Sequence, residues 1–487
     1  MKKIKRFLNI AYEQKNIWHN ALFVLVALIM VFFCFCTQRS VEWHKPETVP
    51  YPIEDITGQS QYIKQFDAFF KGQLHLDVEV SEVLLNLTNP YDPAARDEAG
   101  AVYYWDHAYF EGKYYSYFGI APIATVYFPV YLATGAIPND ALACIMLAIY
   151  AVIFCVLAYR EVVIRFCKKA NIWLFLTGEA AFVAASGVYL GLLCSDIYYI
   201  AVLSALASAM AFVFFAFRAM RDRNIPLRAA LLALAAIALT LTVLSRPTAA
   251  LMCAAVFPIF VEFLFGIKRE TLREGLVTVG AFVLPLLAGA AFVMWYNAAR
   301  FGSPFDFGAN YQLTVSDISE NKFELTLLFS ALFSYLLYPF WFIKSKPHIV
   351  MGNQLLLPPV ATRYIYCDSY IGAFAHGLPL AVLLYPRIMC LDKKEGKREY
   401  TKTAFVLLAC ALALFVSFFN FCYAGVNMRY IYDIVATLSL VGSFVLLDLQ
   451  ARAEGRGKIF TALLCLAIYA AAIISCIGSV ETIRLRF

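Results

Sequence analysis

The sequence predicts an all-α polytopic membrane protein with about eleven transmembrane helices and a long first exterior loop that contains juxtamembrane helices. Three observations support this prediction, and the first is composition. Of the 487 residues, 62% are apolar and 15% are charged, and the mean hydropathy is +0.68. Soluble proteins are nearer half apolar and a quarter charged, so the excess apolar surface must face lipid. This composition excludes soluble enzymes, disordered proteins and collagenous proteins.

The second observation is the length of the apolar runs. The first run, 19–36, follows a basic N-terminus and precedes no small-residue cleavage site, so we interpret it as an uncleaved anchor. The apolar stretches 118–135 and 323–343 contain internal prolines or flanking charge, and we assign both to the exterior surface. Runs of roughly 20 residues, the length that crosses a bilayer, predict the other spans at 140–159, 172–194, 197–217, 228–245, 248–266, 275–296, 370–389, 403–423, 429–449 and 459–479.

The third observation is the position of the basic residues. If 118–135 crossed the membrane, the four basic residues of 160–169 would face outward, against the positive-inside rule. We therefore expect a multi-pass protein of the cytoplasmic membrane, with a cytoplasmic N-terminus and an exterior C-terminus. The net charge of +6 is modest and is explained by basic residues in cytoplasmic loops, so it predicts no nucleic-acid partner. In this topology 25 of the 40 Lys and Arg residues fall in cytoplasmic segments, namely 1–15, 160–169, 218–228, 268–273, 387–402 and 452–458.

The topology divides the chain into membrane and exterior parts. The two halves show no inverted repeat of the kind that many transporters contain. The predicted parts are a cytoplasmic N-terminus and first span at 1–36, a first exterior loop with juxtamembrane helices at 37–139, transmembrane helices 2–7 at 140–296, a second exterior loop at 297–369 and C-terminal transmembrane helices 8–11 at 370–487.

Aromatic side chains crowd one part of the first exterior loop. Nine of the seventeen residues 102–118 are Phe, Tyr or Trp, and Asp106 and His107 stand among them. One interpretation is an interfacial belt, because Tyr and Trp favour the headgroup level of a membrane. The other is a wet cleft that binds sugar, in which rings pack on the apolar faces of a pyranose and acids take its hydroxyls. In that cleft Trp105, His107 and Tyr115 would contact the substrate.

Charged residues stand at the exterior ends of several spans. Asp55, in the first loop, is either a general base for an acceptor hydroxyl or a solvated loop acid. Asp196 lies directly between the third and fourth runs, where an acid is costly unless it is paired, metal-bound or wet. Arg246, in a Ser-Arg-Pro-Thr turn, and Arg429 lie at outer span ends. Either a phosphate group or simple snorkelling explains these two arginines.

The order of these features resembles the GT-C superfamily of polytopic glycosyltransferases, closest to uncharacterised bacterial members. The shared features are the basic N-terminus, the anchor span, the acid-bearing first exterior loop and the acid after the third span. The phrases at 114–122 (YYSYFGIAP) and 299–308 (ARFGSPFDFG) and the pair Arg429-Tyr add to the likeness, which covers about 20–450. It implies transfer of a sugar from a polyprenyl-phosphate-linked donor, outside the cytoplasmic membrane, to a cell-envelope glycan, lipid or protein.

The resemblance also implies roles for individual residues. An acid of the first exterior loop would be the base, and Asp196 matches an acid that often helps to bind Mg²⁺ or Mn²⁺. Many relatives carry Thr-Gly-Asp-x-x-Tyr in that loop, where this chain has Gln59, so Asp55 is the first substitute for the base and Asp106 the second. Arg246 and Arg429 would hold the donor phosphate, and no nucleotide cofactor is needed.

Two other classes of function stay open. A lipid-linked glycan transporter or flippase would use Asp196, Arg246 and Arg429 along a polar path. An inactive partner subunit of the same superfamily would explain why Gln59 replaces the expected acid.

Overall fold

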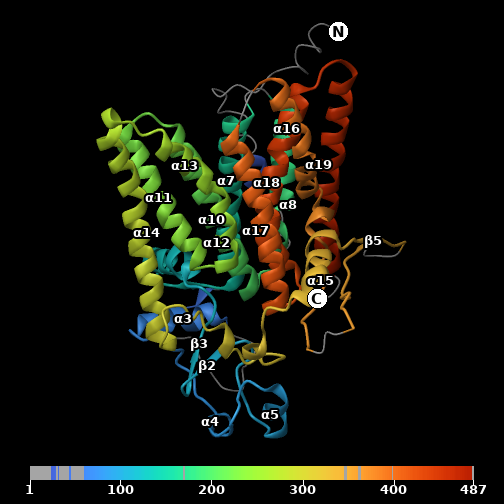
Figure 1. Cartoon of the computed structure of the whole chain (residues 1–487). Coiled ribbons are helices and arrows are strands. Elements are labelled where there is room, and N and C mark those ends of the chain that lie inside the picture. The colour runs from blue at the N-terminus through green and yellow to red at the C-terminus, as the bar shows by residue number, and fades with distance from the viewer. Residues whose placement is uncertain are drawn as a thin grey trace.

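The computed structural model describes residues 24–28, 31, 43–44, 60–167, 170–344, 348–359, 363–396 and 399–484. Most of these residues form a bundle of long helices (Figure 1). Nine helical runs in the described ranges are long and apolar enough to cross a membrane: α7 (Asp140–Phe166), α8 with α9 (Ile172–Cys194), α10 (Ile197–Arg221), α11 (Ile225–Val243), α12 with α13 (Pro247–Phe265), α14 (Leu272–Phe301), α17 (Tyr400–Ala424), α18 (Met428–Arg452) and α19 (Gly455–Arg484). The predicted class, an all-α polytopic membrane protein, is confirmed, whereas the count of eleven spans is not.

Two of the expected spans need separate comment. The first, 19–36, lies largely outside the described residues. The second, 370–389, is not one α-helix, because Gly377 (φ 76°) and two prolines interrupt it. It consists of the 3₁₀ segments η9 (Ala373–His376) and η10 (Leu378–Leu384), followed by α16 (Tyr385–Lys394).

This irregular segment nevertheless runs the length of α18. Near its start the amide of Asp368 donates to the carbonyl of Val426, just before α18 begins. A Cβ on Gly442 of α18 would lie 1.9 Å from the Leu378 carbonyl oxygen, so only glycine allows the two backbones to approach so closely. Near its end Arg452, the last residue of α18, donates to Asp392 at 2.6 Å. The segment therefore traverses the bundle as a tenth crossing among the described residues.

Side-chain caps and burial explain where the spans begin and how they pack. Asn139 caps α7 through the amide of Leu142 at 3.0 Å, and Asn224 caps α11 through Leu227 at 3.1 Å. Most of α10 is buried, because it packs between α7 and α11. In contrast α14 is mostly exposed and packs chiefly against α11.

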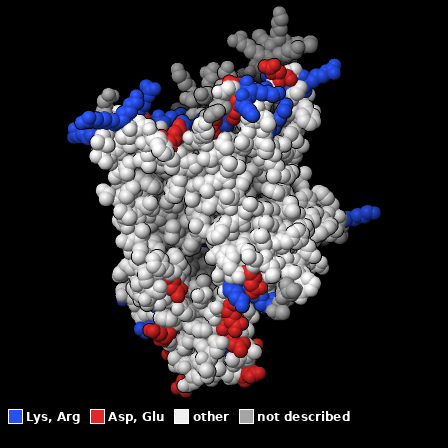
Figure 2. Space-filling model, in the orientation of Figure 1, with Lys and Arg blue, Asp and Glu red and all other residues white. Residues whose placement is uncertain are grey.

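The bundle has two ends of different character. We call the end at which α7, α10 and α18 begin the loop end, and the end at which they finish the basic end. Figure 2 shows Lys and Arg gathered at the basic end, where the sequence places its basic segments. The first exterior loop, with α3, α4 and α5, lies at the loop end, whereas β5 of the second loop projects from the side of the bundle (Figure 1).

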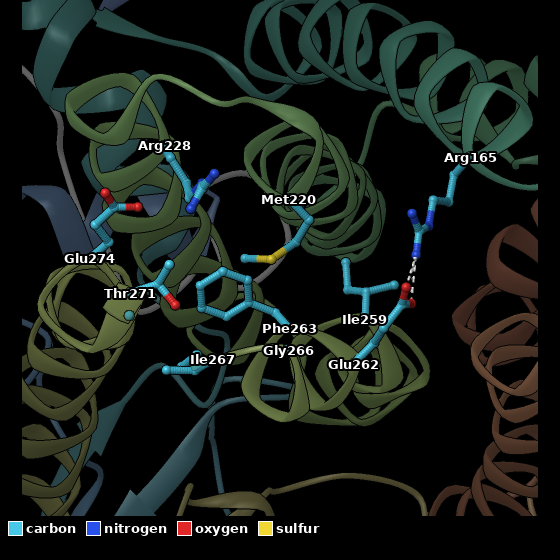
Figure 3. A pocket seen from close by; sticks show the side chains of 11 residues that line it. Arg165, Met220, Arg228, Ile259, Glu262, Phe263, Gly266, Ile267, Thr271 and Glu274 are labelled. Carbon is cyan, nitrogen blue, oxygen red and sulfur yellow. Dashed lines mark hydrogen bonds and ion pairs between the residues drawn. The ribbon is translucent and has the colours of Figure 1, made fainter. Parts of the chain in front are cut away.

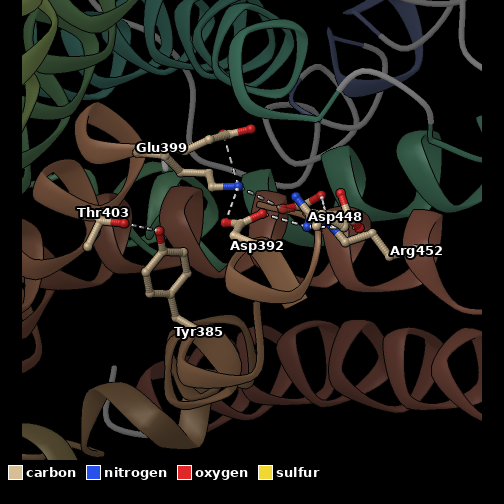
Figure 4. A network of polar contacts seen from close by, with 8 residues as sticks. Tyr385, Asp392, Glu399, Thr403, Asp448 and Arg452 are labelled. Atoms are coloured by element: carbon tan, nitrogen blue, oxygen red, sulfur yellow. Dashed lines mark hydrogen bonds and ion pairs between the residues drawn. The ribbon is translucent and has the colours of Figure 1, made fainter. Parts of the chain in front are cut away.

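A buried charge network joins three helices at the basic end (Figure 4). Lys402 of α17, whose side chain is 1% exposed, lies 3.2 Å from Asp392 of α16, 3.0 Å from Glu399 and 3.2 Å from Asp448 of α18. Arg452 contacts the same Asp448 at 2.8 Å and Asp392 at 2.6 Å. The network therefore fixes α16, α17 and α18 relative to one another.

Short elements build the loops. The apolar segments Ile123–Thr134 and Leu325–Leu337 are shorter than a span. In the first loop lie α3 (Gln61–Phe70), α4 (Glu82–Leu85), α5 (Pro93–Glu98), η2 (Ile123–Tyr127) and α6 (Phe128–Thr134), the antiparallel pair of β2 (Ala108–Phe110) with β3 (Lys113–Tyr115), and β1 (Trp43–His44) paired with β4 (Ile137–Pro138). The second loop holds α15 (Leu328–Leu332), η8 (Phe333–Leu337), several single 3₁₀ turns, and β5 (Trp341–Phe342) paired with β6 (Ile349–Val350).

The two exterior loops pack against each other and against the spans. The amide of Asp106 donates to the Leu313 carbonyl at 3.0 Å, and the Leu313 amide donates to the His107 carbonyl at 3.0 Å. Arg96, fully buried, donates to the Thr314 carbonyl at 2.6 Å. The amide of Ala121 donates to the carbonyl of Leu244, at the end of α11, at 3.1 Å. The first loop is therefore held by the second loop and by the bundle.

Candidate functional site

Asp106 links the first exterior loop to the start of α10. Its backbone has a left-handed φ of 53°, which Asp tolerates better than most residues. The Gln61 side chain donates to its carbonyl at 2.6 Å, and its carboxylate accepts a hydrogen bond from the Tyr198 hydroxyl. Asp106 is 8% exposed, so its carboxylate is held in one place rather than solvated.

Arg429 lies beside this acid–tyrosine pair, at the start of α18. Its guanidinium stands 4.0 Å from the centre of the Tyr198 ring and 5.1 Å from that of Tyr430, and it donates to the Tyr430 hydroxyl at 3.2 Å. Asn427 caps the helix by accepting from the Arg429 amide at 3.0 Å. Among the residues that the structure describes, no carboxylate forms an ion pair with Arg429. Within the described part of the chain, its direct contacts are therefore with aromatic rings and a hydroxyl rather than with a carboxylate.

Arg246 is in the opposite situation. Its Nε and Nη2 donate to the two carboxylate oxygens of Asp433 at 2.7 and 2.8 Å. Thr248 and Asn420 donate to the same carboxylate at 2.8 and 3.3 Å. The Arg246 guanidinium lies 5.6 Å from the Tyr430 ring, which also contacts Arg429. The structure thus brings both predicted phosphate ligands together, but Asp433 neutralises one of them.

Asp196 caps α10. Its Oδ1 accepts from the amides of Tyr198 and Tyr199 at 2.9 and 3.0 Å. Burial raises the pKa of its carboxyl, and those amides and the nearby Arg429 charge act in the opposite direction. Asp196 therefore belongs to the same cluster as Asp106 and Arg429, joined to both by Tyr198.

A metal would need more oxygen ligands than this cluster supplies. The charge of Asp196 acts on Asp140, so the two acids lie near each other. The described residues contain no group of three His, Cys, Asp or Glu side chains with metal-binding geometry. Mg²⁺ prefers six oxygen ligands, and some of these are usually water. The described residues alone do not complete a Mg²⁺ or Mn²⁺ site at Asp196.

The three predicted sugar-contacting residues differ in exposure. Trp105 is 43% exposed and lies on the surface. His107 is buried beside Tyr104 and its Nδ1 lies 2.8 Å from the Trp105 carbonyl oxygen. Burial and the nearby Lys64 charge lower the pKa of His107 to about 3, so its imidazole is neutral. Tyr115 is buried against Phe301.

An apolar groove of about 290 Å³ lies beside the end of α3, where Phe69 lines it. Ile123 and Phe128 of the exterior segment and Trp295 and Tyr296 of α14 line it. Gln65 of α3 donates to the Tyr296 hydroxyl at 3.0 Å, whereas Gln61, one turn earlier, contacts Asp106. Because residues four apart lie on the same face of a helix, the polar cluster and the apolar groove follow each other along one face of α3.

Sequence reasoning missed three members of the cluster. Asp433 and Tyr430 lie in the first turns of α18, and Tyr198 follows Asp196 by two residues. An acid inside a span requires a partner, so Asp433 could have been paired with a nearby arginine. Asp55 and Gln59 lie outside the described residues.

Neither a protein-family model nor a curated protein matches this chain. Two solved structures of Archaeoglobus fulgidus proteins are similar to it. The oligosaccharyltransferase in its apo form is 13% identical, with a TM-score of 0.49. The oligosaccharyltransferase AglB in complex with an inhibitory peptide and a dolichol-phosphate is 12% identical, with a TM-score of 0.41. Each match covers 96% of this chain and 56% of the other, so the chain spans little more than half the length of either.

Proposed function

We propose that this protein is a membrane glycosyltransferase that moves a sugar from a polyprenyl-phosphate-linked donor to an exterior glycan, lipid or protein. The observation that carries the proposal is Arg429, a half-buried cation with no carboxylate partner among the described residues. A cation in that position is costly unless an anion joins it. The donor phosphate is such an anion, and the resemblance of the sequence to GT-C enzymes supplies the type of reaction.

The surroundings of Arg429 suit both parts of the donor. A guanidinium offers two parallel N–H groups to one phosphate, which fixes its orientation. The apolar groove beside α14 offers a surface for the prenyl chain, because only apolar atoms line it. In this proposal Trp105 contacts the sugar at the surface, while His107 and Tyr115 support the loop from within.

The reaction then needs a base and a stabilised leaving group. A carboxylate takes the proton of the acceptor hydroxyl, and the acceptor oxygen bonds to the anomeric carbon as the bond to the lipid phosphate breaks. Arg429 stabilises the charge that grows on that phosphate. In this proposal Asp106 acts as the base, and the Tyr198 hydroxyl, which donates to its carboxylate, orients it. Asp55 remains the other candidate, and Asp196 caps α10 and would contribute to any metal site.

A lipid-linked glycan transporter is a second candidate, favoured by Glu179. This acid of α8 (Ile172–Ala185) is fully buried, and neither carboxylate oxygen has a hydrogen-bond partner among the described residues. Acids buried within spans commonly mark transport paths. The test reconstitutes the protein in vesicles and measures movement of lipid-linked sugar across the vesicle membrane. If Glu179→Gln abolishes this movement, and the unchanged protein transfers no sugar, transport is the function.

The test of transfer compares two arginines. Lipid extracts of cells with and without the protein identify the donor that accumulates, and the purified protein is then assayed with it. We expect Arg429→Lys to weaken donor binding at least tenfold, because the lysine loses the planar fork. Arg363→Lys is the matched control, since Arg363 lies at the same end but is paired with Glu324 at 3.4 Å. Equal effects of the two changes contradict the proposed role of Arg429.

The base is tested separately. Asp106→Asn and Asp55→Asn keep the size of the side chain but remove its ability to take a proton. We expect one of them to abolish transfer while donor binding is retained. An active protein in which neither change slows transfer contradicts the placement of the base in the first loop.

A further inference from the structure

A cavity of about 310 Å³ opens at the basic end, among α10, α11, α13 and α14 (Figure 3). It is far from the Arg429 cluster: Met220 of α10 lines it, whereas Tyr198 of the same helix lies in the cluster, roughly 33 Å away at 1.5 Å per residue. The proposed transfer reaction uses none of its residues. Part of its wall is apolar, formed by Ile259, Phe263 and Ile267.

The charged residues of this cavity fall into two groups. Arg165 and Glu262 neutralise each other, because Nη2 of the arginine lies 2.5 Å from both carboxylate oxygens. Arg228 and Glu274 are the second group, and both extend from the helices on one side of the cavity in Figure 3. The Nε and Nη2 atoms of Arg228 donate to the carbonyl of Asp222 at 3.0 and 2.7 Å.

Neither member of the second group has a charged partner. Within the described residues Arg228 forms no ion pair with a carboxylate, and the Glu274 side chain has neither a hydrogen bond nor an ion pair. The Phe263 ring lies 5.6 Å from the Arg228 guanidinium. The cavity therefore presents one cation, one anion and one aromatic ring to whatever enters it.

Large apolar side chains are exposed beside the cavity, next in sequence to residues that line it. Leu264 and Phe265 at the end of α13 are 50% and 88% exposed, and Leu272 and Leu276 at the start of α14 are 50% and 64% exposed. Exposed side chains of this kind on membrane helices contact acyl chains. The cavity thus lies where charged groups meet a lipid-facing surface.

We propose that this cavity binds the headgroup of a phospholipid that carries both a phosphate and a primary ammonium. Arg228 pairs with the phosphate, and Glu274 pairs with the ammonium, which also lies over the Phe263 ring. The acyl chains cover the exposed leucines and phenylalanine of α13 and α14. A purely anionic headgroup fits less well, because Glu274 would repel a second negative charge.

Binding here would add contacts to α14, the least buried of the nine helical spans in the described ranges. Because α14 is mostly exposed and packs chiefly against α11, a lipid held in the cavity would add contacts between α14 and α13, which share little surface. The lipid should therefore stabilise the folded protein by preferential binding.

The experiment measures thermal unfolding and lipid binding of the full chain in detergent. The probes are phosphatidylethanolamine, phosphatidylcholine and phosphatidylglycerol with the same acyl chains, and soluble phosphoethanolamine. We expect phosphatidylethanolamine to bind at least about tenfold more tightly than the other three probes. Glu274→Gln should abolish its preference over phosphatidylcholine, and Arg228→Gln should weaken both lipids.

The control is Arg273→Gln, which removes an exposed charge beside the cavity without changing its lining. This variant should bind like the unchanged protein. Equal binding of all lipids, a preference for phosphatidylglycerol, or phosphoethanolamine binding as tight as the lipid would each overturn the proposal. If Arg228→Gln does not fold, the exposed Glu274→Gln variant still decides the matter, because an unchanged lipid preference in it also overturns the proposal.

Discussion

Replacing Arg246 by methionine should destabilise the bundle strongly, because it leaves a buried carboxylate without its cation. The Asp433 side chain is 2% exposed and accepts two charge-assisted bonds from Arg246. Only the neutral donors Thr248 and Asn420 would remain. Removing one partner of such a pair costs about 3–5 kcal/mol. The double change Arg246→Met with Asp433→Leu should recover most of this loss, since no charge is then left unpaired.

The assay is denaturant unfolding in mixed micelles, with each single variant compared with the double variant. Arg429→Met serves as the control, because Arg429 loses only ring contacts and one bond to a hydroxyl, worth about 1–2 kcal/mol. If Arg246→Met costs less than Arg429→Met, or if the double variant is no more stable than the single ones, the pair does not stabilise the bundle. Arg246 would then be available to an anion, as the sequence suggests.

Three further predictions concern other parts of the molecule. Lys402→Met should lower the free energy of unfolding by roughly 1.5–3 kcal/mol, since it removes one of the two cations that pair with Asp392 and Asp448 in the network of Figure 4 and leaves Arg452 as the other; an unchanged unfolding transition would contradict this. Burial lowers the pKa of His107 from 6.5 to about 3, so below pH 6.5 the unfolded chain binds the proton and the folded chain does not. Between pH 7 and pH 5 the stability should fall by roughly 2 kcal/mol more than in His107→Gln, and equal falls would refute the burial argument. An impermeant thiol reagent should label Asn310→Cys in intact cells and Lys394→Cys only after permeabilisation, and the reverse pattern would invert the topology.

The sequence was sufficient to locate most of the spans, because a long apolar run in lipid must satisfy its backbone hydrogen bonds internally and therefore forms a helix. It also placed Asp196 at a span boundary, where it caps α10. The irregular 370–389 segment was harder, because Gly377 and Pro379 act on backbone geometry that hydropathy does not report. Hydropathy predicts that a segment crosses, not how its backbone is coiled.

The polar cluster could be predicted only in part. Arg246, Arg429 and Asp106 were each recognised as unusual, but their partners come from distant parts of the chain. The Arg246–Asp433 pair joins residues 187 positions apart, and the Tyr198–Asp106 contact joins residues 92 positions apart. Such pairs depend on how helices are arranged in space, which a single sequence does not specify.

The 3₁₀ coiling of η10 has a consequence for the reach of the chain. A 3₁₀ helix rises about 2.0 Å per residue and an α-helix about 1.5 Å. The seven residues Leu378–Leu384 therefore extend about 14 Å, roughly 3.5 Å farther than the same residues would as α-helix. A shift of about 3.5 Å is enough to break a hydrogen bond or an ion pair. If this stretch were coiled as α-helix, Asp392 would stop short of Arg452 and Lys402, so the tighter coil is what allows a short segment to deliver its acid to the far end of the bundle.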